Sequence, residues 1–161
     1  GVKLSPYYTG LAHFARDLDR LPVRGLVLFN RFLQPDIDIE TLELVYEVHR
    51  SHPDDLRLPL RWIAILRNLV RCDLALSSGV HSAEAAIKAL LAGANAVYCC
   101  SALYRKPEGS VIREILDGLN AWMTRHDFAS IDAFRGRMRE RELGDGRGFE
   151  RAHYVRLVGR T

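Results

Sequence analysis

Asp73-Leu74-Ala75-Leu76-Ser77-Ser78-Gly79-Val80 is the stretch of this 161-residue chain that decides the fold. Its first four residues predict a strand, and the polar Ser77-Ser78-Gly79 predicts the turn that follows the strand. Ser82 can then cap a helix, which Gly93 can end. A strand, a small polar turn and a helix in close succession form one half of a parallel β-α-β unit.

The same succession occurs three more times along the chain. The clearest further strand is Gly25-Leu26-Val27-Leu28-Phe29, a continuous apolar run of the kind found in strands buried on both faces of a parallel sheet. Apolar residues at helical spacing follow each strand, with Thr9 the expected N-cap of the first helix and Pro22 its end. The predicted strands are residues 2–4, 25–29, 73–76 and 94–100, and the predicted helices are 11–21, 60–71, 82–92, 110–123 and a short one at 130–138.

Residues 30–58 interrupt this regular pattern after the second strand. Leu42, Leu44, Tyr46 and Val48 alternate with mostly polar residues, and this two-residue period indicates a strand or one arm of a hairpin. Helical spacing remains an alternative for this segment.

Alternating strands and helices predict a parallel sheet with right-handed crossovers. Two α/β architectures fit the pattern: an open doubly wound sheet, or part of a TIM (β/α)₈ barrel. A whole barrel takes about 250 residues, so a chain of 161 residues can hold only half of one.

The composition excludes several classes of protein. The chain is 48% hydrophobic and 27% charged with a net charge of +3, which is ordinary for a soluble globular protein. No apolar run reaches the length of a membrane helix, and no signal peptide opens the chain. The three cysteines are expected to be reduced thiols in the cytoplasm. Residues 135–160 carry eight Arg and four acids, which we interpret as a solvated tail or an oligomer contact rather than a nucleic-acid surface.

Two strand ends near the C-terminus together predict an anion site. Ser77-Ser78-Gly79 ends one strand and Cys99-Cys100-Ser101 ends the next, about twenty residues later. In barrels the loops after the last two strands commonly bind phosphate, because N–H groups at a helix start point at the anion. A plain turn of small residues is an equally good interpretation of the spacing alone, and the strand position of Cys100 predicts a buried thiol.

Lys3 and Asn30 are further candidates at strand positions. A buried strand lysine must be paired or bind a ligand, whereas a lysine at a frayed chain start simply faces water. Asn30 closes the second strand on the functional rim of a parallel sheet, where its amide could contact a planar substrate and Arg31 a carboxylate. His81 is interpreted as a polar loop residue, since no local carboxylate orients it.

Four stretches of the chain, in the same order and at similar separations, resemble the dihydroorotate dehydrogenases, especially the class 1 and dihydroorotate dehydrogenase-like group. Each stretch is similar to a strand end of the family's barrel, from its fifth strand to its eighth. The four are Gly1-Val2-Lys3-Leu4-Ser5-Pro6-Tyr7-Tyr8, Val27-Leu28-Phe29-Asn30-Arg31, Ser77-Ser78-Gly79-Val80 and Cys99-Cys100-Ser101-Ala102-Leu103.

The resemblance implies the C-terminal half of an FMN-binding (β/α)₈ barrel, strands five to eight, over residues 1–139, with a basic extension at 140–161. It also implies that Lys3 contacts the flavin and that Asn30 binds a dihydropyrimidine-like substrate. The family's FMN phosphate would lie against Ser78, Gly79, Cys100 and Ser101. Ser78 departs from the family, which usually has glycine there.

The implied activity is the oxidation of dihydroorotate to orotate in pyrimidine biosynthesis, with hydride passing to FMN. The family's catalytic base lies in a loop after the fourth strand, so no catalytic residue is predicted in this chain. A half-barrel is expected to need a missing N-terminal half or a homo-oligomer. The alternatives are a non-catalytic half-barrel that binds phosphate or FMN, and an open-sheet protein unrelated to flavin.

Overall fold

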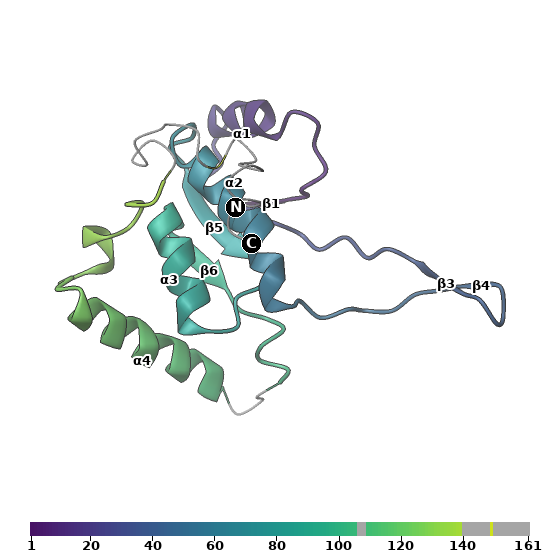
Figure 1. The fold of residues 1–161 in the computed structure, drawn as a ribbon. Coiled ribbons are helices and arrows are strands. Elements are labelled where there is room, and N and C mark those ends of the chain that lie inside the picture. The colour runs from purple at the N-terminus through teal and green to yellow at the C-terminus, as the bar shows by residue number, and fades with distance from the viewer. Residues whose placement is uncertain (106–108, 140–148, 150–161) are drawn as a thin grey trace, which may run out of the picture.

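The computed structural model describes residues 1–105, 109–139 and 149, and its centre is a four-stranded parallel sheet in the order β1-β2-β5-β6 (Figure 1). All three strand pairings in this sheet are parallel, as predicted from the sequence. The strands and helices, in chain order, are β1 (Val2–Leu4), α1 (Leu11–Asp19), β2 (Gly25–Leu28), β3 (Asp36–Asp38), β4 (Glu43–Val45), α2 (Arg57–Leu66), β5 (Asp73–Ser77), α3 (Ala83–Ala92), β6 (Ala96–Tyr98) and α4 (Ser110–Arg125), with 3₁₀ helices at Pro53–Leu56 and Ile131–Ala133.

One face of the sheet forms the core. Alternate residues of β2 and β5 point to this face and are almost completely buried: Leu26, Leu28, Leu74 and Leu76. Apolar residues of all four α-helices belong to the same cluster, so the helices cover this face. Burial of these side chains is the main source of stability, at about 1.5–3 kcal/mol for each large residue.

No helix covers the opposite face of the sheet, where one residue from each strand pairs with the next across the sheet. Lys3 pairs with Val27, Val27 with Ala75, and Ala75 with Ala96. Lys3 and Ala96 are exposed, and Tyr98, two residues farther along β6, is 54% exposed. This is the face that would point into the lumen of a closed barrel.

Helix α3 begins and ends as the sequence predicts. The Ser82 side chain accepts a hydrogen bond from the Ala85 N–H at 3.3 Å, and Gly93 adopts a left-handed conformation with φ of +113°. A residue with a Cβ would be strained in that conformation, which explains why the helix ends at a glycine.

Other element boundaries differ from the predictions. Helix α1 is capped by Gly10 instead of Thr9 and ends at Asp19, and α2 begins three residues before and ends five residues before the predicted helix 60–71. Ser130 does cap the next segment, but only the 3₁₀ helix Ile131–Ala133 follows. The chain there turns back onto α3, where the Gly136 and Met138 N–H groups donate to the carbonyls of Leu90 and Leu91.

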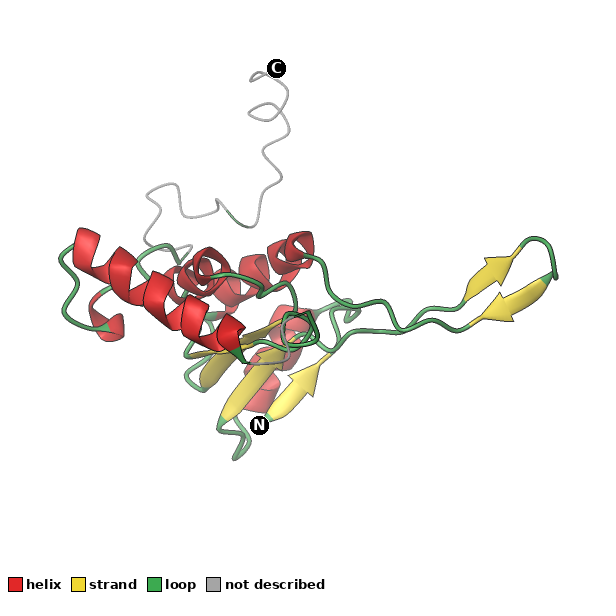
Figure 2. Ribbon diagram, turned by 90° about the horizontal axis from the view of Figure 1, so that it is seen from below, coloured by secondary structure: helices red, strands yellow, loops and turns green. Residues whose placement is uncertain are grey.

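The insertion after β2 is a hairpin that projects away from the sheet and helices (Figures 1 and 2). Its antiparallel strands β3 and β4 pair Ile37 with Leu44. The alternating pattern at Leu42–Val48 thus did mark a hairpin arm. We call residues 32–49 the arm.

Candidate functional site

All six predicted binding residues line one cavity at the carboxyl ends of the four parallel strands. Its volume is about 160 Å³. Pockets for drug-sized ligands are typically 300–1,000 Å³, so this cavity suits a group of about the size of phosphate. The predicted residues in its lining are Lys3, Asn30, Ser78, Gly79, Cys100 and Ser101, and Arg31, Ser51, Ser77, Val80 and Tyr98 complete it.

The turn after β5 provides backbone donors at this cavity. Ser78 and Gly79 both have positive φ, +83° and +74°. Ser78, Gly79 and Val80 all line the cavity. Successive backbone N–H groups in a turn of this kind can form a concave binding surface for an anion. This chemistry fits a phosphate group.

Gly79 has a second reason to be glycine. A Cβ built at this position would lie 2.2 Å from the backbone nitrogen of Leu56, at the end of the 3₁₀ helix that precedes α2. The turn is therefore packed directly against the backbone of the segment that follows the arm, and that contact fixes the position of the turn.

Lys3 lies on β1 with its side chain on the uncovered face of the sheet. Within the described residues it forms no ion pair, so its ammonium group is available to a ligand. The sequence left open whether this lysine is buried on a strand or faces water at a frayed chain start; it is paired in β1 and exposed. Lys3 is exposed because no element covers this face.

Asn30 connects the small cavity to a larger one. Its backbone N–H donates to the Leu4 carbonyl at 2.7 Å, which holds the end of β2 beside β1. The second cavity, of about 440 Å³, shares Asn30, Arg31, Ser77 and Ser78 with the first and is within the usual range for small-molecule sites. The Asn30 amide can therefore contact ligands in both cavities.

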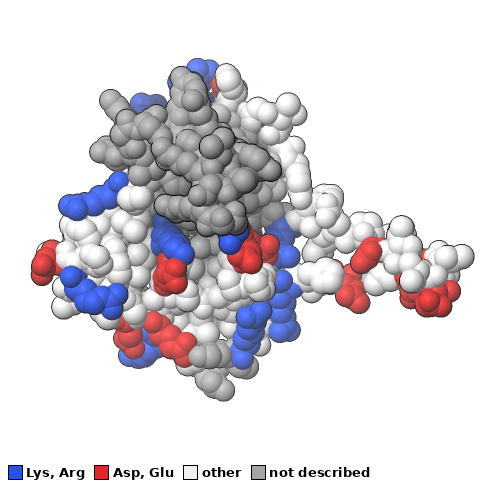
Figure 3. All heavy atoms as spheres, in the orientation of Figure 1, with Lys and Arg blue, Asp and Glu red and all other residues white. Residues whose placement is uncertain are grey.

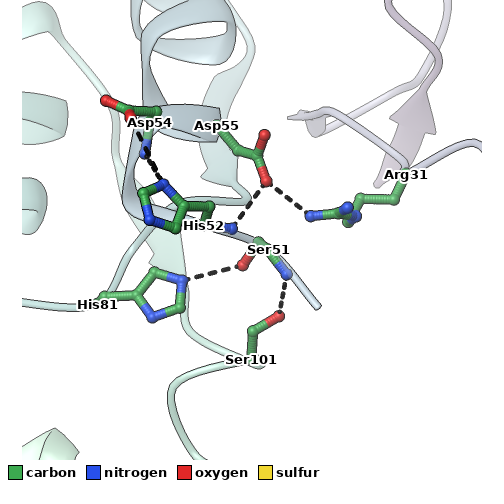
Figure 4. A network of polar contacts seen from close by, with 7 residues as sticks. All are labelled: Arg31, Ser51, His52, Asp54, Asp55, His81 and Ser101. Carbon is green, nitrogen blue, oxygen red and sulfur yellow. Dashed lines mark hydrogen bonds and ion pairs between the residues drawn. The ribbon is translucent and has the colours of Figure 1, made fainter. Parts of the chain in front are cut away.

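A hydrogen-bond network that the sequence analysis missed supports the cavity from the side of the arm (Figure 4). Ser51 is buried, its N–H donates to Ser101 Oγ at 2.8 Å, and its Oγ shares a hydrogen bond of 3.1 Å with His81 Nε2. These contacts join residues 50 and 30 positions apart, and no local pattern in the sequence indicates them. His81, predicted as a polar loop residue, is half-buried, and burial together with the positive charge of Arg105 lowers its pKa.

Both ends of the arm are fixed at this network. Asp55 accepts hydrogen bonds from the His52 N–H at 2.9 Å and from the Arg31 guanidinium at 2.8 Å (Figure 4). Arg31 leads into the arm and Ser51 follows it, and both line the small cavity. The arm therefore leaves the molecule directly from the candidate site.

The environment of Cys100 differs from its prediction. Cys100 is exposed rather than buried, because β6 ends at Tyr98 and the chain has already left the sheet. Cys99 donates to the Val80 carbonyl at 3.4 Å, and burial raises its pKa. Arg61 of α2 donates a hydrogen bond to the Phe149 carbonyl at 2.5 Å.

The described residues contain no cluster of three His, Cys, Asp or Glu side chains arranged to hold a metal ion. In the same part of the chain, no helix has the length and apolar character needed to cross a bilayer. The groups that do converge at the site are an amine, backbone N–H groups, hydroxyls and an amide. They can bind an anion and orient a polar ring beside it.

Comparison with known proteins gives one consistent result. The chain is 29% identical over 140 residues to a putative dihydroorotate dehydrogenase A (fumarate) of Pediococcus pentosaceus, covering 83% of this chain and 44% of that protein. It is 28% identical over 138 residues to the catalytic subunit of the dihydroorotate dehydrogenase B (NAD(+)) of Porphyromonas gingivalis, covering 84% and 44%. No family model matches the chain.

The chain resembles dihydroorotate dehydrogenases over most of its length. The ligand-free dihydroorotate dehydrogenase of Eimeria tenella superposes with a TM-score of 0.66 at 19% identity, covering 83% of this chain and 38% of that structure. The same enzyme in complex with ferulenol gives a TM-score of 0.64 at 20% identity, covering 83% and 36%. These dihydroorotate dehydrogenases are (β/α)₈ barrels, so the predicted half-barrel fold is confirmed. The chain spans less than half the length of the curated relatives it matches.

Proposed function

We propose that this chain is the FMN-holding part of a flavin-dependent oxidoreductase similar to dihydroorotate dehydrogenase. The observation that carries the proposal is the convergence of Lys3, Asn30 and the two strand-end turns on one cavity. These four features belong to four different strands, β1, β2, β5 and β6, which are neighbours in the parallel sheet. The similarity to dihydroorotate dehydrogenases points to the same chemistry.

The residues divide into a phosphate-holding group and a ring-facing group. The N–H groups of Ser78 and Gly79 and the hydroxyl of Ser101 would hold the FMN phosphate, with Cys100 beside them. Lys3 would place its positive charge against the flavin ring, and Asn30 would orient a dihydropyrimidine-like substrate in the larger cavity. FMN, when bound, supplies the hydride-accepting chemistry.

Binding of FMN and of riboflavin by the full chain tests the proposal, because riboflavin lacks the phosphate. We expect quenching of flavin fluorescence with clear preference for FMN. Lys3→Ala should weaken FMN binding by about tenfold to a hundredfold, as removal of a charged hydrogen-bond donor does. Lys88→Ala is the matched control, since Lys88 pairs with Glu84 on the outer surface of α3. Equal affinity for FMN and riboflavin, or equal effects of the two lysine variants, would contradict the proposal.

A second candidate is a half-barrel that binds FMN without catalysis and pairs with another protein chain or with itself. The uncovered face of the sheet, where Tyr98 is 54% exposed, favours a partner of this kind. Turnover of dihydroorotate by the FMN-loaded chain would contradict the second candidate. FMN binding without turnover by the chain alone fits both candidates, because no catalytic residue is predicted in this chain.

A further inference from the structure

Helices α3 and α4 enclose a groove that belongs to neither cavity of the candidate site. Its volume is about 540 Å³, within the usual range for small-molecule sites. None of its described lining residues lines either of the other two cavities. The two helices touch where Gly118 of α4 meets Ala83 at the start of α3, since a Cβ at Gly118 would overlap the Ala83 side chain. The groove continues along both helices from that contact.

The α3 wall of the groove is apolar. Ala83, Ile87 and Leu91 follow one another at intervals of four residues, so their side chains share one face of the helix. Ile87 is only 7% exposed, and Leu91 is half-buried. A wall of this kind favours the apolar part of a ligand, because binding removes apolar surface from water.

The α4 wall presents a tryptophan ring that is held in place from behind. Trp122 is half-buried and packs against Phe128 and Phe134, with ring centroids 5.5 and 5.0 Å away. The His126 ring lies 4.6 Å from it. These contacts restrict the indole to one orientation, and a fixed aromatic ring beside an apolar wall suits a planar aromatic ligand.

The charged residues at the groove leave one positive group unpaired. Lys88 and Glu84, one turn apart on α3, form an ion pair with each other. Arg125, one turn after Trp122 on α4, has no ion-pair partner among the described residues. Two cations and one acid line the groove, so its net charge is +1.

The surroundings of the groove indicate a ligand with a single acidic group. On the face of the molecule drawn in Figure 3, Lys and Arg of the body are interspersed with Asp and Glu, while the arm carries Asp and Glu. The unpaired charge of Arg125 is therefore local. It matches one carboxylate better than a polyanion, because a polyanion binds to a continuous basic surface.

We propose that the groove between α3 and α4 binds a small aromatic acid. The ring of this ligand packs between Trp122 and the wall formed by Ile87 and Leu91, and its carboxylate pairs with the Arg125 guanidinium. Residues three apart share a helix face, so Trp122 and Arg125 can contact the same small molecule. Arginine forms paired hydrogen bonds with a carboxylate, which also fixes the orientation of the ligand. The proposal does not depend on FMN.

Isothermal titration calorimetry of the full chain with cinnamate tests this proposal, and cinnamyl alcohol serves as the uncharged probe with the same ring. We expect saturable binding of cinnamate and weaker binding of the alcohol. Arg125→Gln should weaken cinnamate binding by about threefold to fivefold, as expected for an exposed charge pair. The matched control is Arg113→Gln, which removes another exposed arginine of α4 that does not line the groove. This control should leave cinnamate binding unchanged.

A second variant fills the groove without removing a ligand contact. Ala121 is an exposed residue of α4 in the groove lining, so Ala121→Trp should abolish cinnamate binding and leave the helical circular dichroism unchanged. Cinnamate binding that survives Ala121→Trp would place the probe elsewhere, for example beside Lys3, and would overturn the proposal. The proposal would also be overturned by a lack of saturable cinnamate binding, by equal affinity for cinnamate and cinnamyl alcohol, or by equal effects of the two arginine variants.

Discussion

His81 Nε2 lies 3.1 Å from Ser51 Oγ, although the two residues are 30 positions apart. The contact joins the turn after β5 to the segment that follows the arm, and Ser51 in turn donates to Ser101 after β6. One buried serine therefore links both turns that would hold a phosphate. The relationship makes the protonation state of His81 relevant to the stability of the site.

We predict that the free energy of unfolding falls as the pH drops below about 6.5, the ordinary pKa of histidine, and that His81 is one cause. Burial and Arg105 lower the pKa of His81 in the folded chain, while His52 opposes and Asp55 favours its protonation. Between the lowered pKa of folded His81 and the ordinary histidine pKa, the unfolded chain binds a proton more readily than the folded chain does. Lowering the pH through this interval therefore favours unfolding. Thermal unfolding of the wild type and of His81→Gln at about pH 7.5 and about pH 5.5 measures the effect.

The loss of stability between those two pH values should be smaller in His81→Gln than in the wild type. His126→Gln is the control, since His126 is exposed at the end of α4. Identical pH profiles for His81→Gln and the wild type would contradict the assigned role of His81.

Gly79→Ala should destabilise the chain more than Gly109→Ala. Both glycines have φ of +74°, so alanine strains the backbone at both positions by about 1 kcal/mol. At Gly79 the new Cβ would also lie 2.2 Å from the Leu56 nitrogen, whereas nothing lies within 4 Å at Gly109. Chemical denaturation measures how much each variant loses in free energy of unfolding, and the difference between them reports the clash with Leu56. Equal losses in the two variants would show that the turn after β5 can move away from Leu56.

The parts of the fold that were predicted correctly depend on local chemistry. The apolar run Gly25–Phe29, the Ser82 cap and the Gly93 end of α3 each follow from residues within one element. The strand ends then placed Lys3 and Asn30 near the two turns, because parallel strands finish at one edge of the sheet. The cavity itself required the register of the strands, which no single stretch encodes.

The errors arose where distant parts of the chain decide local structure. Strand β3 contains Asp36 and Asp38, a residue type that is rare in strands, so only its partner strand was indicated by the alternation. Ser51 is buried through contacts with residues 30 and 50 positions away, and its own neighbours are ordinary loop residues. The exposure of Cys100 follows from where β6 ends, which sequence patterns fix only approximately.

Ser101→Ala should reduce both stability and FMN affinity. The change leaves the buried Ser51 N–H without an acceptor, which costs about 1–3 kcal/mol. Ser101→Thr keeps the hydroxyl and should restore most of the stability. Denaturation and flavin titration of the two variants test the role of the hydroxyl. If threonine fails to restore stability, the loss would come from packing at this position rather than from the hydrogen bond.

Asp19 joins the end of α1 to the segment before β5, and its removal should lower stability. The carboxylate accepts hydrogen bonds from the Arg71 N–H at 3.1 Å and the Cys72 N–H at 2.8 Å, and these bonds lower its pKa. Asp19→Ala should cost about 1–3 kcal/mol of unfolding free energy at neutral pH.

This cost should depend on pH. Because the pKa of Asp19 is lowered in the folded chain, its contribution to stability is complete above the ordinary aspartate pKa of about 3.9 and is lost as the pH falls through the folded value. The difference in unfolding free energy between wild type and Asp19→Ala should therefore shrink in acid, and Asp17→Ala, at an exposed aspartate two residues earlier, should cost less at neutral pH. A difference that stays constant from neutral pH into acid would show that Asp19 stabilises the chain by packing and not by its charge.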